Sequence, residues 1–410
     1  MIAYTVLLLS MLVAAAPPSA PIIGGTHPHT SVPFSRRVHP STGTIAGHDR
    51  VRAAQLYEMG KARASGRHAK RQTSLPITSQ VVTYVAEVGV GSPPTNYSLI
   101  IDTGSSNTWV GAGKSYVKTK TSCPTDQIVD VTYGSGGFLG YEVNDTVKLT
   151  KDLVISQSIG VAELSEGFDG VDGILGIGPT DLTEGTVMPD GSAIPTVTDN
   201  LFSQGKITQK VVGVYFAPSS KANDTNGEMT FGAADNSKTT GPIAFAPITS
   251  TSPSSEFFGI DQSITYGTKK STILDITSGI VDTGTTLTLL ASDAFNRYMS
   301  LTGATEDRTT GLLRISPENY ANLQSLSFSI AGTTFEFTRN AQTFPRALNS
   351  AIGGSAGAIY LIIGDLGQDS GSGLDFINGM SFLERYYSLF DSTNNQVGLA
   401  TTAHTFDTTN

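Results

Sequence analysis

The strongest constraint on this chain is an internal repeat in which the tripeptide Asp-Thr-Gly occurs twice, 180 residues apart. The first copy reads IIDTGSSNT from Ile100, and the second reads IVDTGTTLT from Ile280. A shorter similarity follows each copy, GILG at 173–176 and FING at 376–379. Self-similarity over such a length predicts a duplicated lobe with one Asp-Thr-Gly turn in each copy.

A turn without further function is the alternative interpretation of each tripeptide, because Asp and Gly are the commonest turn residues. Two copies with matching aliphatic residues in front of them weigh against it. A carboxylate that directly follows buried aliphatic residues is partly desolvated, which is costly unless the carboxylate has partners. We therefore expect Asp102 and Asp282 to be a functional pair.

From Gln80 onward the chain consists of short runs rich in β-branched and aromatic residues, separated by Gly, Ser and Asn. This pattern predicts an all-β body. Helical periodicity is confined to 51–63, 197–205 and 292–303. The polar stretch at 249–256 is the best candidate for a connection between two lobes, which we place at 72–248 and 249–410.

The scarce residue types narrow the possible chemistry. Five of the six histidines lie in the first seventy residues, the sixth is His404, and Cys123 is the single cysteine. Without its N-terminal part, the body therefore lacks the residues for Ser-His-Asp or Cys-His catalysis, for a His-rich zinc site or for an internal disulfide. We expect chemistry based on carboxylates, hydroxyls and backbone groups, with no metal and no cofactor.

The N-terminal part has two segments. Residues 1–20 contain the apolar run IAYTVLLLSMLVAAA and predict a signal peptide, and hence a secreted, extracellular protein without a membrane anchor. Residues 21–71 carry nine basic and two acidic residues, whereas the remainder has 17 basic and 33 acidic residues. A basic arm that binds nucleic acid is the alternative for this second segment.

We expect instead a pro-segment that charge complementarity holds on the acidic body, where it acts as an intramolecular inhibitor, and no nucleic-acid partner. The dibasic pair Lys70-Arg71 is a plausible processing point. Acid would neutralise the carboxylates of the body and loosen the segment.

The chemistry of the pair follows if the two lobes bring Asp102 and Asp282 together across a cleft. Two carboxylates in contact share one proton, so that their pKa values split. The charged member can take a proton from water while the neutral member protonates a substrate carbonyl oxygen. Neighbouring residues would support the pair by fixing the loops, by allowing close approach of the backbone and by donating hydrogen bonds: Thr103, Gly104, Ser105, Thr283, Gly284 and Thr285. Ordinary turn hydroxyls remain the alternative for Ser105 and Thr285.

Five segments carry a resemblance to a known family: IDTGSSNTWV, VTYGSGGFLG, FDGVDGILGIG, GIVDTGTTLTLL and FLERYYSLFD. The sequence resembles the pepsin-family aspartic proteases, most closely their secreted fungal members. The resemblance implies a bilobal all-β fold, with two homologous six-stranded-type β-barrel lobes, a central substrate cleft and a β-hairpin flap. It also implies a monomeric acid endopeptidase, made as a zymogen, that cleaves peptide and protein substrates at hydrophobic residues, with Asp102 and Asp282 as the catalytic pair.

The resemblance further places Tyr133 and Gly134 at the tip of the flap, with Ser135 beside them. Trp109 matches a residue that can hydrogen-bond the flap tyrosine, and a core aromatic is the alternative for it. The remaining positions expected at the substrate site are Phe138, Ile174 and Thr286. Asn378 departs from the family pattern, because an aliphatic residue is usual there. Asn223 and Asn144 are candidate glycosylation sites, whereas the sequon at Asn96 enters a predicted buried strand and is the least suitable.

Three rival functions are weaker. A non-catalytic relative would commonly lack an Asp, the hydroxyl residue after Gly or the flap tyrosine, and all of these are present. A glycosidase needs two carboxyl groups in different environments, whereas these lie in matching tripeptides. A β-rich carbohydrate-binding or structural protein would leave the pro-segment and the repeated Asp turns without a purpose.

Overall fold

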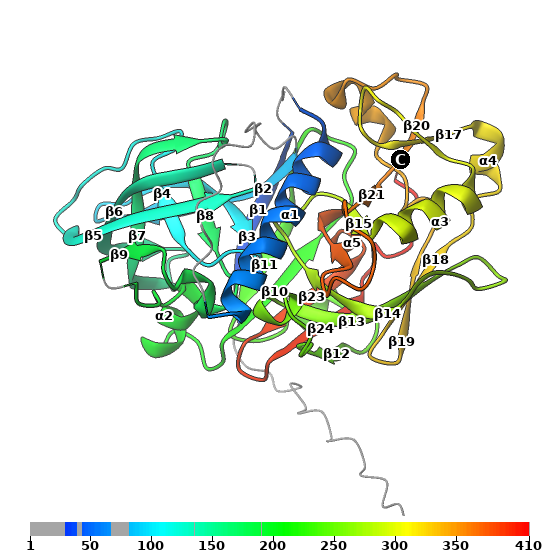
Figure 1. The fold of residues 1–410 in the computed structure, drawn as a ribbon. Coiled ribbons are helices and arrows are strands. Elements are labelled where there is room, and N and C mark those ends of the chain that lie inside the picture. Colours follow the sequence, from blue (N-terminus) through cyan, green and yellow to red (C-terminus); the bar gives the residue numbers. More distant parts are fainter. Residues whose placement is uncertain (1–28, 39–42, 67–81, 135, 190, 410) are drawn as a thin grey trace, which may run out of the picture.

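The computed structural model describes residues 29–38, 43–66, 82–134, 136–189 and 191–409. The predicted signal peptide, Lys70-Arg71 and Ser135 lie outside these residues. Strands dominate and helices are few, which confirms the expectation of an all-β body (Figure 1).

The strands of the first half and of the N-terminal part are β1 (Thr30–Val38), β2 (Val82–Val90), β3 (Thr95–Asp102), β4 (Thr108–Val110), β5 (Cys123–Tyr133), β6 (Gly136–Lys148), β7 (Val154–Glu166), β8 (Gly173–Gly176), β9 (Val187–Met188), β10 (Val211–Phe216), β11 (Asn223–Phe231) and β12 (Ala244–Pro247). The strands that follow are β13 (Gly259–Tyr266), β14 (Ser271–Val281), β15 (Thr288–Leu290), β16 (Thr305–Glu306), β17 (Leu313–Ile315), β18 (Leu326–Ile330), β19 (Thr333–Phe337), β20 (Ile359–Leu361), β21 (Ile363–Asp365), β22 (Phe376–Asn378), β23 (Tyr386–Asp391) and β24 (Gln396–Thr401).

The helices are α1 (Ile45–Ala64), α2 (Val197–Ser203), α3 (Ser292–Thr302), α4 (Pro317–Ala321) and α5 (Met380–Leu383). Four short 3-10 helices are η1 (Thr180–Thr183), η2 (Asn236–Lys238), η3 (Ser254–Glu256) and η4 (Arg346–Ile352). The helices predicted at 197–205 and 292–303 are thus confirmed. The helix predicted at 51–63 is confirmed too, but it begins earlier, because the side chain of Thr44 caps its start by accepting a hydrogen bond from the Gly47 N–H.

The largest sheet has 14 strands in the order β12-β24-β23-β10-β11-β1-β2-β3-β8-β4-β7-β6-β5-β9. One end of this sheet joins distant parts of the sequence, since β23 pairs with β10 and β24 pairs with β12. Strand β1, from the expected pro-segment, lies between β11 and β2. The second half forms a seven-stranded sheet, β19-β18-β13-β14-β22-β15-β21, and a three-stranded sheet, β16-β17-β20.

The sequence repeat corresponds to a repeat in strand pairing. The strand that leads to Asp102, β3, runs parallel to β8, and β8 also pairs antiparallel with β4. In the second half β14 leads to Asp282 and runs parallel to β22. Strand β22 in turn pairs antiparallel with β15. The GILG and FING segments are therefore the strands β8 and β22, each of which holds one Asp-Thr-Gly strand in place.

The departure at Asn378 has a partner in the core. Its amide donates to the side-chain oxygen of Gln262 at 2.8 Å, and the Gln262 amide donates back at 3.2 Å. Both side chains are fully buried. The pair satisfies both amide groups, so a polar residue is tolerated where the repeat has an aliphatic one.

The three sequon asparagines are exposed. Asn144 lies on β6 and Asn223 begins β11. Asn96 enters β3, which is mostly buried as expected, but its own side chain is exposed, because the alternation along β3 turns it outward and buries the next one, Tyr97. Cys123 is exposed as well, at the start of β5.

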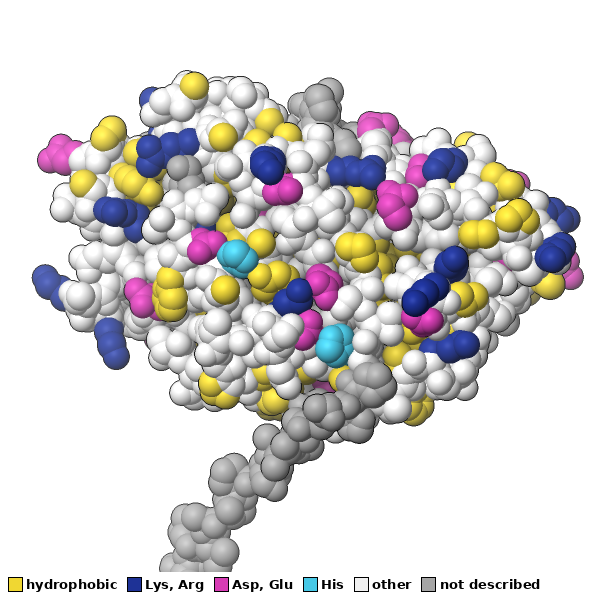
Figure 2. All heavy atoms as spheres, turned by 180° about the vertical axis from the view of Figure 1, so that it is seen from behind, with side chains coloured by type: hydrophobic (Ala, Val, Ile, Leu, Met, Phe, Trp, Pro, Cys, Tyr) yellow, Lys and Arg dark blue, Asp and Glu magenta, His cyan; other side chains and the backbone are white. Residues whose placement is uncertain are grey.

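Surface charge on the reverse side of the molecule is mixed: acidic and basic side chains lie among each other (Figure 2). Among the described residues no helix is long and apolar enough to cross a membrane. Within the same residues, no group of three His, Cys, Asp or Glu side chains is placed to hold a metal ion.

A buried carboxyl group lies on β6, away from the repeated turns. Glu142 is 2% exposed, accepts a hydrogen bond from the Ser158 hydroxyl at 2.9 Å, and its second oxygen has no partner among the described residues. Burial raises the pKa of Glu142 to about 7, against the lowering effect of Ser158. Because this pKa exceeds that of the unfolded chain, the group's stabilising contribution is complete at acidic pH and is lost as pH rises through about 7.

We predict that Glu142→Gln reduces the loss of stability between pH 5 and pH 8, because the amide cannot ionise. Thermal unfolding midpoints at the two pH values measure the effect. Glu163→Gln, which removes an exposed carboxylate of β7, is the matched control and should change with pH as the unaltered protein does. An equal fall of the midpoint in Glu142→Gln and in the unaltered protein would contradict the prediction.

Candidate active site

Asp102 and Asp282 occupy matching positions in the two halves. Asp102 ends β3 and Asp282 directly follows β14. The carboxylate of Asp102 accepts hydrogen bonds from the Gly104 N–H at 2.9 Å and from the Ser105 hydroxyl at 2.5 Å. Asp282 accepts the same pair from Gly284 at 3.0 Å and Thr285 at 2.5 Å. Both carboxylates are at most 1% exposed, so these bonds compensate for lost hydration.

Two threonines tie the turns to each other. The Thr103 N–H donates to the Thr283 hydroxyl oxygen at 3.0 Å, and the Thr283 N–H donates to the Thr103 oxygen at 2.9 Å. Each hydroxyl in turn donates to a backbone carbonyl of the opposite strand, at Val281 and Ile101. These reciprocal bonds fix the position of one Asp turn relative to the other.

The two glycines allow this close approach. A side chain on Gly104 would collide with the carboxylate of Asp282, and one on Gly284 would collide with that of Asp102. Each turn therefore packs directly against the carboxylate of the other half, and only glycine leaves room for it.

A side chain from α1 lies between the two carboxylates. The Nη2 atom of Arg52 is 2.6 Å from Asp102 Oδ1 and 3.0 Å from Asp282 Oδ1, and its Nε is 2.8 Å from Asp282 Oδ2. The Arg52 side chain is 6% exposed. One guanidinium thus pairs with both members of the dyad in a site closed to water.

The dyad is electrostatically asymmetric. Burial raises the pKa of Asp102, and the neighbouring Asp282 adds to this, so the net shift is upward although Arg52 opposes it. Burial would also raise the pKa of Asp282, but the charge and hydrogen bonds of Arg52 and the bonds from Thr285 and Gly284 outweigh it, and the net shift is downward. Asp282 is therefore the member that Arg52 holds most firmly in its ionised form.

Asp49, one helical turn before Arg52, contacts the second turn directly. Its carboxylate accepts the Thr286 N–H at 3.2 Å and the Leu287 N–H at 2.7 Å. Burial raises the pKa of Asp49 to about 7, although these bonds and Arg52 act to lower it. Helix α1 thus covers both the dyad and the backbone that follows Asp282.

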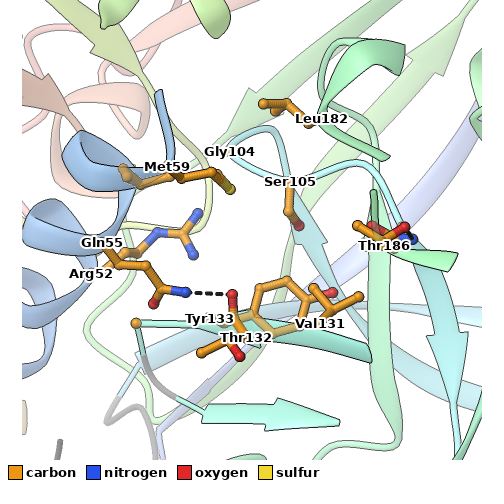
Figure 3. Close-up of a pocket in the computed structure, with 13 residues that line it drawn as sticks. Arg52, Gln55, Met59, Gly104, Ser105, Val131, Thr132, Tyr133, Leu182 and Thr186 are labelled. Carbon is orange, nitrogen blue, oxygen red and sulfur yellow. Dashed lines mark hydrogen bonds between the residues drawn. The ribbon is translucent and has the colours of Figure 1, made fainter. Parts of the chain in front are cut away.

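The β5–β6 hairpin also packs against α1. Gln55 donates to the Thr132 carbonyl oxygen, and Gly134 lies so close to the Arg52 backbone that a side chain there would overlap with it. A small cavity remains between the helix, the hairpin and the first Asp turn, and Figure 3 shows Arg52 and Gln55 reaching into this region from α1.

An aromatic cluster supports the hairpin from beneath. The Trp109 ring stacks on Phe138 at 4.3 Å and lies nearly parallel to Tyr133 at 6.3 Å between centroids, and Phe168 meets both edge-on. Ile174 belongs to the same buried cluster. The Tyr133 hydroxyl and the Trp109 indole N–H make no hydrogen bond to a described residue.

The sequence-predicted residues thus fall into three groups. The dyad and its six supporting residues lie together, with Thr286 beside them. Tyr133 and Gly134 line the cavity, whereas Trp109, Phe138 and Ile174 lie in the cluster beneath it. Sequence reasoning missed Asp49, Arg52 and Gln55, because nothing in the pattern distinguishes these residues from their neighbours in a basic segment.

Comparisons with known proteins agree with this geometry. The family model for eukaryotic aspartyl proteases matches residues 83–402. The chain is 62% identical to polyporopepsin of Irpex lacteus over 338 residues, which are 82% of this chain and 99% of that protein. It is 30% identical to pepsin A of Gallus gallus over 346 residues, 79% of this chain and 86% of the relative.

A solved structure is similar over most of the chain. The crystal structure of the aspartic proteinase from Irpex lacteus matches with a TM-score of 0.80 and 55% identity, over 93% of this chain and all of that one. This match confirms the bilobal, all-β, pepsin-like fold. The chain belongs to the pepsin family of aspartic endopeptidases.

Proposed function

We propose that this protein is a secreted acid endopeptidase, made as an inactive precursor, in which Asp102 and Asp282 activate a water molecule. The observation that carries the proposal is the matched pair of buried carboxylates with one guanidinium of α1 between them. The body acts as a monomer on peptide and protein substrates and needs no cofactor.

In the active form, α1 has left the cleft and the dyad lacks its cation. Two adjacent carboxylates without Arg52 retain one shared proton, because ionisation of both would leave two like charges in contact. The ionised member takes a proton from the water that attacks the peptide carbonyl carbon. The protonated member donates to the carbonyl oxygen, and the tetrahedral intermediate then collapses as the amide nitrogen receives a proton and leaves.

In the precursor, three features block these steps. Arg52 occupies the position between the carboxylates and pairs with both of them, so that neither is free to act on water or on a substrate carbonyl oxygen. Asp49 occupies two backbone N–H groups after the second turn. The flap hairpin is bound to α1 through Gln55 instead of to a peptide.

Strand β1 anchors the pro-segment in the body. Phe34 is 1% exposed and packs edge-on against Tyr84 and Phe216. Burial of such a ring contributes about 2 kcal/mol. Charge complementarity therefore acts together with strand pairing and apolar contact, which the basic composition alone does not predict.

The lining of the cavity supports a preference for hydrophobic residues around the scissile bond. On the body side Val131, Tyr133 and Leu182 face the space, and on the pro-segment side Leu56 and Met59 fill part of it. We expect apolar substrate side chains to take the place of these apolar pro-segment side chains when α1 leaves.

The first test is cleavage of an unfolded protein by chain that lacks residues 1–71, measured from pH 2 to pH 8. We expect cleavage at acidic pH only, and a loss of at least about a hundredfold in Asp102→Asn, since the amide cannot transfer the proton. Asp275→Asn, at an exposed position of β14, is the control and should keep the activity. Folded, processed protein that cleaves at no pH would instead favour a binding protein.

The second test concerns the intact precursor. We predict that Arg52→Gln makes the unprocessed chain cleave a peptide at pH 5, because removal of one partner from a buried charge cluster costs about 3–5 kcal/mol. Arg50→Gln is the matched control: Arg50 pairs with Asp365 at 2.8 Å, but its side chain is 49% exposed, and such pairs contribute at most about 1 kcal/mol. Mass spectrometry verifies that the chain is intact, and an inactive Arg52→Gln chain would contradict the inhibitory role.

The pH dependence of docking has opposing parts, and Asp102, whose pKa is raised in the docked state, acts in the same direction as Asp49. Asp49 has a raised pKa in the docked state, so protonation between about pH 7 and pH 4 strengthens docking. Asp282 has a lowered pKa in the docked state. Its ionised carboxylate therefore strengthens docking at pH values above the ordinary carboxyl range, and this contribution to docking is lost as the pH falls through the lowered pKa. Docking is therefore tightest at mildly acidic pH, and release requires stronger acid.

We predict that the α1 amides of the precursor gain protection from hydrogen exchange, corrected for intrinsic rates, between pH 7 and pH 5. In Asp49→Asn this gain should be smaller, because the amide group does not titrate. The same gain in both proteins would contradict the assignment to Asp49.

A further inference from the structure

Near the C-terminal end of α1, one arginine lies between carboxylates from the two halves of the body. Arg63 Nη2 is 3.4 Å from Glu184 Oε2, and its Nε is 3.9 Å from Glu256 Oε2. Glu184 follows η1 in the first half, whereas Glu256 ends η3 in the second. The Arg63 side chain is only 12% exposed, in contrast to the exposed Arg50.

The helix is pressed closely against the body at this end. A side chain on Gly60 would collide with Pro253 and with the ring of Phe257, which is 2% exposed. The Nε atom of Arg63 is buried and has no hydrogen-bond partner among the described residues. The two glutamates therefore face a partly enclosed position, into which a long basic side chain extends.

The position is remote from the dyad. Arg63 lies eleven residues after Arg52 on one continuous helix, which corresponds to about 16 Å along the axis. An extended peptide covers the same distance in about five residues. Figure 1 shows α1 in front of the boundary between the two halves, where strands of the first half lie on one side and those of the second on the other.

We propose that Glu184 and Glu256 form a remote subsite for a Lys or Arg side chain of the substrate. The inference rests on the proposed function, in which the substrate replaces α1 in the cleft. When α1 leaves, Arg63 leaves as well, and the two carboxylates face the vacated position. The subsite adds a charge preference several residues from the scissile bond to the apolar preference near it.

The expected effect is moderate. The Glu184 and Glu256 side chains are 50% and 25% exposed, so each pair with a substrate cation is screened by water. Together they should improve kcat/KM for a basic substrate by about threefold to tenfold. The change should appear in KM, because a contact this far from the reacting atoms stabilises the bound substrate and the transition state equally.

The test uses processed enzyme at pH 5, above the ordinary pKa range of glutamate. Matched peptides carry Lys or Gln at one position, which is scanned from two to six residues on each side of a common scissile bond. We expect a Lys-over-Gln preference at one or two remote positions on one side. It should fall in Glu184→Gln and in Glu256→Gln, and disappear in the double variant.

Asp275→Asn is the control for net charge, since it removes an exposed carboxylate of β14, and it should keep the Lys-to-Gln ratio of the unaltered enzyme. A ratio near one at all positions, or a preference that survives the double variant, would overturn the subsite. Cleavage of the Gln peptides that is lost in Asp102→Asn would uphold the proposed function even then, so the two failures are distinguishable.

Discussion

The structure depends on the reciprocal hydrogen bonds between Thr103 and Thr283, which join two Asp turns from different halves of the chain. These bonds, with the glycines beside them, bring two desolvated carboxylates so close that one guanidinium nitrogen contacts both. Burial makes the carboxylates sensitive to each other and to any nearby cation. In the proposed function the same proximity allows two states, one in which Arg52 pairs with both carboxylates and one in which the two carboxylates share a proton.

In the proposed function, the N-terminal part of the chain occupies the surfaces that a substrate would use. Arg52 engages the dyad, Asp49 accepts backbone N–H groups, Gln55 binds the flap and Arg63 lies between two glutamates. Its attachment has an ionic part and an apolar part, since β1 is a strand of the 14-stranded sheet and carries the buried Phe34. In the proposed function acid acts on the ionic part alone, and the opposite pKa shifts of Asp49 and Asp282 limit its effect to low pH.

The sequence predicted much of the fold and the composition of the site. Alternating strands and the duplicated Asp-Thr-Gly segments are local signals, and each one has a direct counterpart in strand pairing. The role of Arg52 is different, because it depends on how a helix docks against residues 50 and 230 positions away. The joining of β23 and β24 to strands of the first half is equally non-local. Asn96 shows the limit of a pattern: one step in strand alternation decides whether a side chain is buried or exposed.

The central claim is that α1 and a substrate compete for the same dyad. The most direct measurement is calorimetric binding, at pH 4, of a peptide inhibitor that carries a tetrahedral hydroxyl group in place of the scissile carbonyl. The intact chain and chain without residues 1–71 are compared. The account predicts one-to-one binding to the processed chain and binding at least a hundredfold weaker to the intact chain, by about 2.7 kcal/mol or more. Equal affinity for both would contradict it.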